Sequence, residues 1–234
     1  MSAQLMIVED DTRVRTSLRL AMEDEGYVVA EAELAETALD QVRTHGVPDV
    51  MIVDLMLGSG MDGYTCIREV RREHDVPIIV VSARDDTHDV VAALEAGADD
   101  FVTKPFEVKE LTARIRALRR RTRNTVEREV TELVLDAGRQ LVLCQERGSV
   151  QLGGADLHLT LTEFRLLCEL AGNDGLVLSR QVLLDKIWDR GFFGDERIVD
   201  VHVRRLRTKI ERDPADPRLL VTVRGLGYRL DVQA

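Results

Sequence analysis

The first half of the chain alternates short, almost wholly apolar runs with longer segments whose apolar residues recur every three or four positions. The apolar runs are rich in valine, isoleucine and methionine and predict strands over Gln4–Val8, Val28–Glu31, Asp49–Val53, Pro77–Val81 and Phe101–Thr103. Strands that are apolar on both faces are typical of a parallel sheet covered by helices on both sides. Five strand–helix units therefore predict a doubly wound α/β domain, (βα)5, with flavodoxin-like strand order.

The second half has a different pattern, with short strands separated by glycine-containing turns. We expect these strands over Thr131–Asp136, Leu141–Gln145, Ser149–Leu152 and Leu157–Leu161. Three helices should follow, with N-caps at Thr162, Ser179 and Asp195. A hairpin of Leu219–Val223 and Tyr228–Val232 comes next. Three helices followed by a β-hairpin form a winged helix, here preceded by a small antiparallel sheet.

The two halves also differ in charge. The 234 residues have a formal net charge of -10, which taken alone argues against a DNA-binding protein. Residues 1–121 contain 24 acidic and 15 basic residues (-9), whereas residues 122–234 contain 18 and 17 (-1). We expect one domain over residues 1–121, a linker over 122–126 and a second domain over 127–234. The asymmetry indicates two modules with different partners.

Several classes of protein are disfavoured by the sequence. No apolar run approaches the roughly 20 residues of a membrane-spanning helix, and a signal-peptide pattern is absent. The cysteines, Cys66, Cys144 and Cys168, are widely separated and odd in number, which suits neither a disulfide framework nor a structural metal site. We therefore expect a cytoplasmic protein with reduced cysteines.

Polar side chains follow the strands of the first half, at the edge where doubly wound sheets bind ligands. They are Glu9, Asp10 and Asp11 after the first strand, Asp54 after the third, Ser82 after the fourth and Lys104 after the fifth. Clustered carboxylates can bind Mg²⁺, and one carboxylate can attack phosphorus while a lysine and a hydroxyl bind the phosphoryl oxygens. Asp54 is the best nucleophile candidate, and Asp10, helped by Glu9, is the best metal ligand. Each residue alone is common in loops, so the combination is what points to this chemistry.

Four motifs surround these strand ends. They are Ile7-Val8-Glu9-Asp10-Asp11, Val53-Asp54-Leu55-Met56, Val81-Ser82-Ala83 and Gly97-Ala98-Asp99-Asp100-Phe101-Val102-Thr103-Lys104-Pro105-Phe106. With them, residues 1–121 resemble the receiver domain of two-component response regulators. The resemblance implies that Asp54 accepts a phosphoryl group from the phosphohistidine of a sensor histidine kinase.

The same resemblance implies roles for the residues around Asp54. The implied Mg²⁺ ligands are Glu9, Asp10, Asp54 and the backbone carbonyl of Met56. The implied phosphoryl contacts are Ser82 and Lys104, with Phe101 at the aromatic switch position and a cis Lys104–Pro105 bond.

The loop after Asp54 departs from the family pattern. Leu57-Gly58-Ser59-Gly60-Met61-Asp62-Gly63 lacks the usual proline and is one residue longer. Because two glycines replace a proline, we expect a looser loop beside an intact phosphorylation site.

The third helix of the second half is locally basic. From Arg197 to Arg212 it has six basic residues against two acidic ones, a local charge of +4. One face is apolar, and the other should present to a DNA major groove the residues Arg197, Val201, His202, Arg204, Arg205 and Thr208. A solvated charged face is the alternative. Arg224, at the glycine-flanked hairpin tip, can reach a minor groove.

Three further motifs lie in this half, namely Leu161-Thr162-Glu163-Phe164-Arg165-Leu166-Leu167, Val199-Asp200-Val201-His202-Val203-Arg204-Arg205-Leu206-Arg207 and Thr222-Val223-Arg224-Gly225-Leu226-Gly227-Tyr228-Arg229. With them, residues 127–232 resemble the winged-helix effector domain of the OmpR/PhoB family of transcription factors. The resemblance implies base contact by Arg205, minor-groove contact by Arg224, and phosphate contacts by Arg197, His202, Arg204, Arg207 and Trp188. It also implies contact with RNA polymerase at the loop Asp189–Gly194, where packing of a phenylalanine is the alternative reading.

The family resemblance further implies a homodimer through the fourth helix, fifth strand and fifth helix of the receiver. Its charge pairs map to Asp100 with Arg114 and to Asp99 with Arg121. The usual basic partner of Glu110 is replaced by Val90. Since an exposed ion pair contributes only about 0–1 kcal/mol, its loss does not exclude the dimer.

The sequence thus favours a phosphorylation-controlled, DNA-binding transcriptional regulator rather than an enzyme. An atypical regulator of the same fold that works without phosphorylation is the alternative. A metal-dependent aspartyl-phosphate phosphatase would carry an Asp-x-Asp pair on its first strand, and Asp54-Leu55-Met56 has no second acid. A constitutive architectural DNA binder would not need the acidic residues of the first half.

Overall fold

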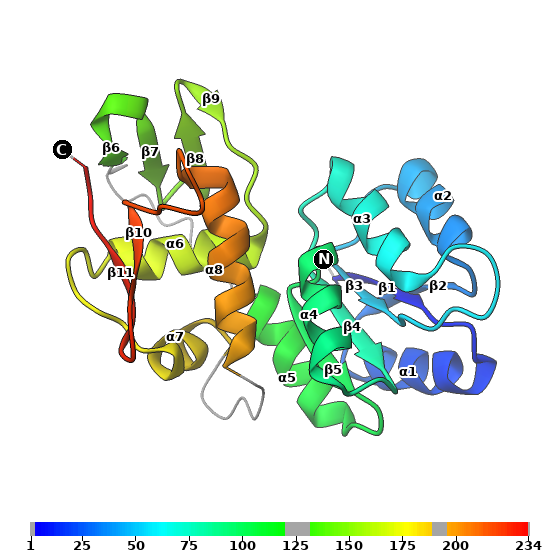
Figure 1. Cartoon of the computed structure of the whole chain (residues 1–234). Coiled ribbons are helices and arrows are strands. Elements are labelled where there is room, and N and C mark those ends of the chain that lie inside the picture. Colours follow the sequence, from blue (N-terminus) through cyan, green and yellow to red (C-terminus); the bar gives the residue numbers. More distant parts are fainter. Residues whose placement is uncertain (1–2, 120–131, 189–195, 234) are drawn as a thin grey trace. The chain divides into compact units, whose positions relative to one another are not determined.

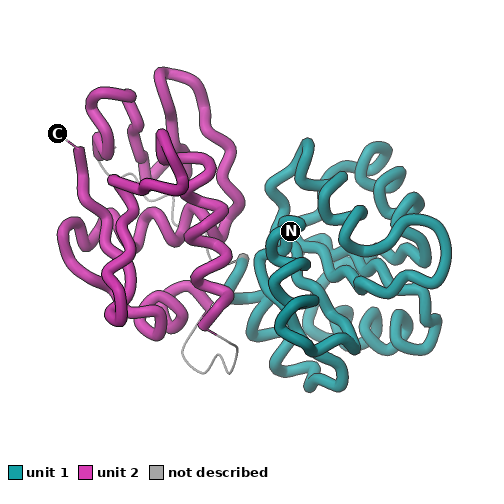
Figure 2. The backbone as a smooth tube through the Cα atoms, viewed as in Figure 1, with its two compact units in different colours: residues 1–119 teal, residues 120–234 magenta. Residues whose placement is uncertain are grey.

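The computed structural model describes residues 3–119, 132–188 and 196–233. The chain forms two compact units, Met1–Arg119 and Arg120–Ala234 (Figure 2). The expected linker 122–126 lies outside the described residues, so the domain boundaries at 121 and 127 stay predictions.

The first unit is built on a five-stranded parallel sheet in the order β2-β1-β3-β4-β5 (Figure 1). The strands are β1 (Gln4–Val8), β2 (Val28–Ala32), β3 (Val50–Val53), β4 (Ile78–Ser82) and β5 (Asp100–Thr103). All five expected strands are confirmed to within one residue at each end. The strand order confirms the flavodoxin-like, doubly wound fold.

Five helices cover this sheet. They are α1 (Thr12–Asp24), α2 (Ala35–His45), α3 (Gly63–Glu73), α4 (Thr87–Ala96) and α5 (Val108–Arg119). Helices α1 and α5 pack together and share one apolar core with the sheet, whereas α2, α3 and α4 pack in sequence on its other face. Aspartates cap α1, α3 and α4 through their side chains, at Asp11, Asp62 and Asp86.

The register of the central strands positions the candidate site. Val8, the last residue of β1, pairs with Val53, the last residue of β3. The residues that follow, Glu9 and Asp54, therefore emerge side by side at the carboxyl edge of the sheet. Lys104 follows β5 at the same edge.

Over its described residues, the second unit contains two antiparallel sheets and three α-helices. A four-stranded sheet comprises β6 (Glu132–Asp136), β7 (Leu141–Cys144), β8 (Ser149–Leu152) and β9 (Ala155–Asp156). The helices are α6 (Leu161–Ala171), α7 (Arg180–Ile187) and α8 (Arg197–Ile210), and the hairpin is β10 (Leu220–Val223) with β11 (Gly227–Leu230). This confirms a winged helix behind a small antiparallel sheet. No helix among the described residues is long and apolar enough to cross a membrane.

Three local expectations for this unit are wrong. The strand expected over Leu157–Leu161 is instead β9 (Ala155–Asp156), followed by irregular chain and the start of α6. The N-cap of α6 is Thr160 rather than Thr162, because Thr160 forms a reciprocal capping box with Glu163. The N-cap of α8 is Glu196 rather than Asp195 and makes no side-chain capping bond. The Ser179 cap of α7 is confirmed.

An ion pair between the half-buried Arg71 and the buried Asp99 joins α3 to the β4–β5 part of the sheet. The Arg71 guanidinium lies 2.6 Å from the Asp99 carboxylate and donates to the carbonyls of Gly97 and Val76. Asp99 is fully buried and also accepts from the Ile78 N–H at 2.9 Å. The pair thus fastens α3 to the connection that leads into β5 and to the start of β4.

We predict that Arg71→Met lowers the free energy of unfolding of the first unit by about 3 kcal/mol, because it leaves the Asp99 charge buried without its partner. Arg72→Met is the matched control, since the neighbouring Arg72 is exposed and pairs with Glu69 at the surface. It should cost no more than about 1 kcal/mol. Urea unfolding followed on the amide NMR signals of the sheet measures both, and equal stabilities of the two variants would contradict the assignment.

Candidate functional site

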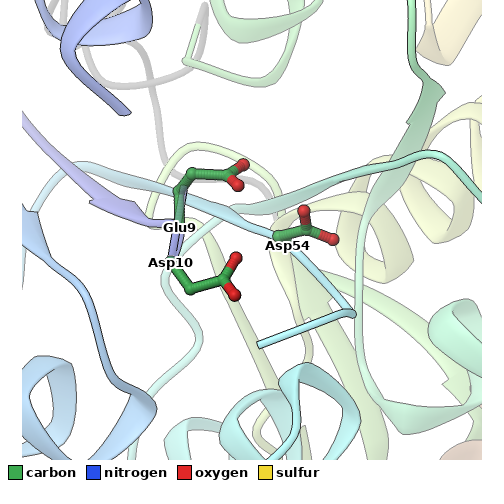
Figure 3. Close-up of side chains that lie close together, drawn as sticks. All are labelled: Glu9, Asp10 and Asp54. Atoms are coloured by element: carbon green, nitrogen blue, oxygen red, sulfur yellow. The ribbon is translucent and has the colours of Figure 1, made fainter. Parts of the chain in front are cut away.

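An acidic pocket lies at the carboxyl edge of the first unit's sheet. Glu9 and Asp54 are buried and Asp10 is half-buried. One carboxylate oxygen from each of the three lies within 4.8 Å of the others. Figure 3 shows Glu9 and Asp10 at the end of β1 and Asp54 at the end of β3, with their carboxylates directed into a shared space.

Lys104 supplies the positive charge of this pocket. Its Nζ lies 2.6 Å from Oε2 of Glu9 and 2.6 Å from Oδ2 of Asp54. The other oxygen of Asp54, Oδ1, accepts the N–H of Met56 at 2.9 Å. The carboxylate of Asp54 is therefore fixed in orientation through both of its oxygens.

The protonation of these groups follows from burial and pairing. Burial raises the pKa of Glu9, and the Asp54 charge raises it further, against the hydrogen bond from Lys104, which lowers it. For Lys104, burial alone would lower the pKa, but the hydrogen bonds to Asp54 and Glu9 outweigh it and the pKa is raised. Lys104 is thus held as a cation.

The donor set of the pocket fits a divalent cation. Three carboxylates and one ammonium group leave a formal charge of -2, which one Mg²⁺ would neutralise. Mg²⁺ takes oxygen ligands at about 2.1 Å, so two of its ligands lie at most about 4.2 Å apart, and the three oxygens here lie within 4.8 Å of one another. Glu9, Asp10 and Asp54 are the residues that would hold it. The predicted contribution of the Met56 carbonyl stays a prediction.

The remaining receiver residues lie on the neighbouring strands. Ser82 is fully buried at the end of β4, and its Oγ accepts the N–H of Arg84 at 3.3 Å. Phe101 is buried in β5, where it pairs with Val80 of β4. The cis peptide bond at Lys104–Pro105 is confirmed. Ser82 and Phe101 thus lie on β4 and β5, the two strands between β3, which Asp54 follows, and the β5 edge of the sheet.

The residues expected to pair across a dimer have partners within the chain. Asp100 lies 3.1 Å from Arg114, and Asp99 pairs with Arg71. Both aspartates are fully buried. Arg121 lies outside the described residues. The intermolecular pairs therefore stay predictions.

The exposed face of α8 differs from the expected one. Arg197, Arg204 and Thr208 are exposed, whereas Val201 and His202 are buried, so their expected exposure is wrong. His202 lies one helical turn from both Val199 and Leu206 and therefore belongs to the apolar stripe. Its ring packs 5.3 Å from the Trp188 ring, which is also buried. This buried pair is a packing contact of α7 with α8 and is not placed to meet a DNA phosphate.

Contacts with α6 and with the hairpin hold basic side chains of α8 in place. The fully buried Glu163 of α6 lies 3.0 Å from Arg205 and 2.7 Å from Nζ of Lys209. Arg207 donates to the carbonyl of Leu220 and to the hydroxyl of Thr222, which ties α8 to the hairpin. These contacts fix the direction of the basic helix relative to α6 and the wing.

A second acidic anchor joins α7, α8 and the hairpin. Asp200 of α8 accepts from Nε of Arg180 at 2.6 Å and from the hydroxyl of Tyr228 at 2.5 Å. Burial and the bond to Asp200 raise the pKa of Tyr228 to about 12. Arg224 is exposed in the turn that joins β10 to β11, as expected. The loop 189–195, with its expected polymerase contact, lies outside the described residues.

Sequence reasoning missed Glu163 as an anchor of α8. The Thr-x-x-Glu pattern from Thr160 to Glu163 is the signature of a capping box and could have identified the cap. No local pattern indicates that the same carboxylate also reaches Arg205 and Lys209, because that contact depends on how the helices pack.

Comparisons with known proteins cover both units. Residues 5–116 match the family described as response regulator receiver domain, and residues 154–230 match that described as transcriptional regulatory protein, C terminal. The transcriptional regulatory protein AfsQ1 of Streptomyces coelicolor is 45% identical, over 97% of each chain. The sensory transduction protein RegX3 of Mycolicibacterium smegmatis is 42% identical, over 97% of this chain and 98% of its own. The crystal structure of the Thermotoga maritima response regulator DrrB, an OmpR/PhoB homologue, is 29% identical, covers 99% of this chain and 100% of its own, and has a TM-score of 0.51.

We predict that Glu163 makes the second unit sensitive to acid. Burial alone would raise the pKa of Glu163, but Arg205 and Lys209 outweigh it and lower the pKa below the usual 4.5. A depressed pKa in the folded state contributes stability above pH 4.5 that is lost as the pH falls through the folded value. Glu163→Gln should therefore lower the free energy of unfolding at pH 7 by about 2–3 kcal/mol and flatten its decline in acid.

Trp188 is the single tryptophan of the chain and lies in this unit, so its fluorescence during urea unfolding reports the change. Glu169→Gln on the same helix is the control, because Glu169 pairs with the half-exposed Lys186 at 3.6 Å. Equal pH profiles for wild type and Glu163→Gln would refute the role of Glu163.

Proposed function

Because the chain belongs to the OmpR/PhoB-type response regulators, the transcriptional regulators of two-component systems, we propose that phosphorylation of Asp54 by a sensor histidine kinase controls its binding to promoter DNA. The observation that carries the proposal is the position of Asp54, held between Lys104 and the carboxylates of Glu9 and Asp10. In this proposal the protein meets both partners, the kinase and the promoter, in the cytoplasm.

The pocket suits attack on phosphorus by Asp54. A carboxylate oxygen of Asp54 bonds to the phosphorus of the kinase phosphohistidine, the phosphorus–nitrogen bond breaks, and the imidazole leaves and takes up a proton. Bound Mg²⁺ would neutralise charge on the transferring phosphoryl group. Lys104, already 2.6 Å from Asp54, is placed to bind a phosphoryl oxygen once the group is attached. The Ser82 hydroxyl is the second candidate contact.

The phosphorylated state must then be communicated beyond the pocket. In this proposal, contact of the phosphoryl group with Ser82 shifts the end of β4, and Phe101 on the adjoining strand changes position with it. The α4–β5–α5 face lies next to these residues. It would form the homodimer, with Asp99, Asp100, Arg114 and Arg121 as the charged groups that the family resemblance assigns to it. To pair across the dimer, Asp99 would have to leave Arg71 and Asp100 would have to leave Arg114 of its own chain.

The second unit would read the promoter through α8 and the wing. Arg205 is the proposed base contact. Its guanidinium has five N–H donors, so some of them can pair with Glu163 while others donate to a base. The exposed Arg197 and Arg204 would contact phosphates, and Arg224 would enter the minor groove. RNA polymerase is the further partner proposed for the loop 189–194.

We predict that Asp54→Ala abolishes Mg²⁺-dependent labelling by acetyl phosphate or a phosphorylated kinase, because the nucleophile is removed. The same exchange at Asp40, exposed on α2, should leave labelling unchanged. Beryllofluoride should raise the dimer fraction of the wild type in sedimentation, but not that of Asp54→Ala. Undiminished labelling of Asp54→Ala would refute Asp54 as the phosphoacceptor. A dimer fraction that does not change with beryllofluoride would favour the phosphorylation-independent regulator.

For DNA, Arg205→Ala and Arg204→Ala are neighbouring variants with different expected effects. Loss of a base contact at Arg205 should cost roughly 1–3 kcal/mol of discrimination at one base pair. Loss of a phosphate contact at Arg204 should weaken binding to all sequences alike and reduce the salt slope by about 1. Fluorescence anisotropy on duplexes selected by the wild type from a random pool, and on scrambled versions of them, separates the two effects. Equal losses of discrimination would overturn the assignment.

A further inference from the structure

The β3–α3 loop reaches the acidic pocket through its backbone. The N–H of Gly58 donates to Oδ2 of Asp10 at 2.9 Å. Asp10 is one of the three carboxylates that share the pocket and is the one most exposed to solvent. Because a hydrogen bond to one oxygen of a carboxylate restricts its rotation, Gly58 fixes how Asp10 presents its oxygens to the pocket.

A second acidic residue fastens the other end of the loop. The N–H of Met61 donates to Oε1 of Glu36, in the first turn of α2, at 2.8 Å. Gly60 lies between the two anchors with φ +77°, and a Cβ there would lie 2.6 Å from the same Glu36 oxygen. Glycine at position 60 thus allows the loop to close on Glu36.

Gly58 lies as close to Asp10. A Cβ on Gly58 would lie 2.7 Å from Oδ2 of Asp10, so a side chain at this position would displace the carboxylate from its present orientation. A proline at this position would have no N–H to donate. The proline-free loop thus keeps a backbone donor at position 58 that faces Asp10.

We propose that this loop positions the metal ligand Asp10, with Gly58 as the donor and Glu36 as the anchor that holds the loop from α2. The proposal rests on the function proposed above, since it concerns the same Mg²⁺ site. Gly58 and Glu36 are positioning residues, because each acts through the loop. Removal of residues that orient a metal ligand typically costs 10–100-fold in affinity. This bond is exposed, so we expect an effect just below that range, about 5–10-fold.

The test is a Mg²⁺ titration of the ¹⁵N-labelled full chain, followed by NMR. Glu36→Ala and Gly58→Pro should each raise the dissociation constant for Mg²⁺ by about 5–10-fold. Glu36→Gln keeps an acceptor oxygen and should retain most of the affinity. Asp40→Ala is the charge control, since it removes one exposed carboxylate from the same helix and should leave the affinity near that of the wild type. Exchange of the Gly58 amide should also be faster in Glu36→Ala, without any metal.

Wild-type affinity in Glu36→Ala and Gly58→Pro would overturn this proposal and leave the proposed function intact. An equal loss in Asp40→Ala would also overturn it, because charge alone would then explain the effect. Failure of the wild type to bind Mg²⁺ would overturn both. Unchanged exchange of the Gly58 amide in Glu36→Ala would refute the anchoring role of Glu36.

Discussion

Three carboxylates held at one edge of a parallel sheet repel one another, and the first unit is arranged to hold them there. Two unit charges about 4 Å apart interact by roughly 4 kcal/mol at the effective dielectric of a protein site. The pairing of β1 with β3 sets Glu9 and Asp10 beside Asp54 regardless of that repulsion. Lys104 offsets it from β5 through two short ion pairs. A divalent cation would relieve the remaining charge, and Lys104 would then be available to a phosphoryl oxygen.

In the second unit the crowded charges are positive, and an acidic side chain offsets them. Its α8 is rich in cations, and the buried Glu163 of α6 determines where two of those cations lie. Glu163 holds Arg205 and Lys209, while Asp200 joins Arg180 to the wing. The near-neutral charge of this half is therefore compatible with a basic surface, because part of its acidity orients the helix that carries the arginines. The total charge of this half conceals the separation of acidic anchors from basic surface residues, whereas the positions of the charges show it.

The fold was largely predictable, and the details that failed have physical causes. Apolar runs and their spacing predicted five strands and the hairpin, and the convergence of parallel strand ends predicted that Asp54 and Lys104 meet. The alternation over Leu157–Leu161 is compatible with a strand, but the capping box of Thr160 starts a helix inside it. His202 was misplaced because its polar side chain suggested exposure, although its spacing from Val199 and Leu206 puts it on the apolar stripe. Contacts such as that of Arg71 with Asp99 depend on packing and leave no local signal.

The β3–α3 loop shows how one residue type supports opposite inferences. From sequence, glycine in place of proline indicates a looser loop, because each glycine costs roughly 0.5–1 kcal/mol in chain entropy on folding. In the structure, the same two glycines let the backbone approach two carboxylates closely enough for hydrogen bonds. A hydrogen bond to a charged group contributes about 1.5–3 kcal/mol when well shielded, and less at an exposed position such as this one. Two such bonds are therefore of the size needed to offset the entropy of two glycines. The proline-free loop is therefore held by its contacts with Asp10 and Glu36 rather than by its own stiffness, and the first of these contacts ties it to a carboxylate of the pocket.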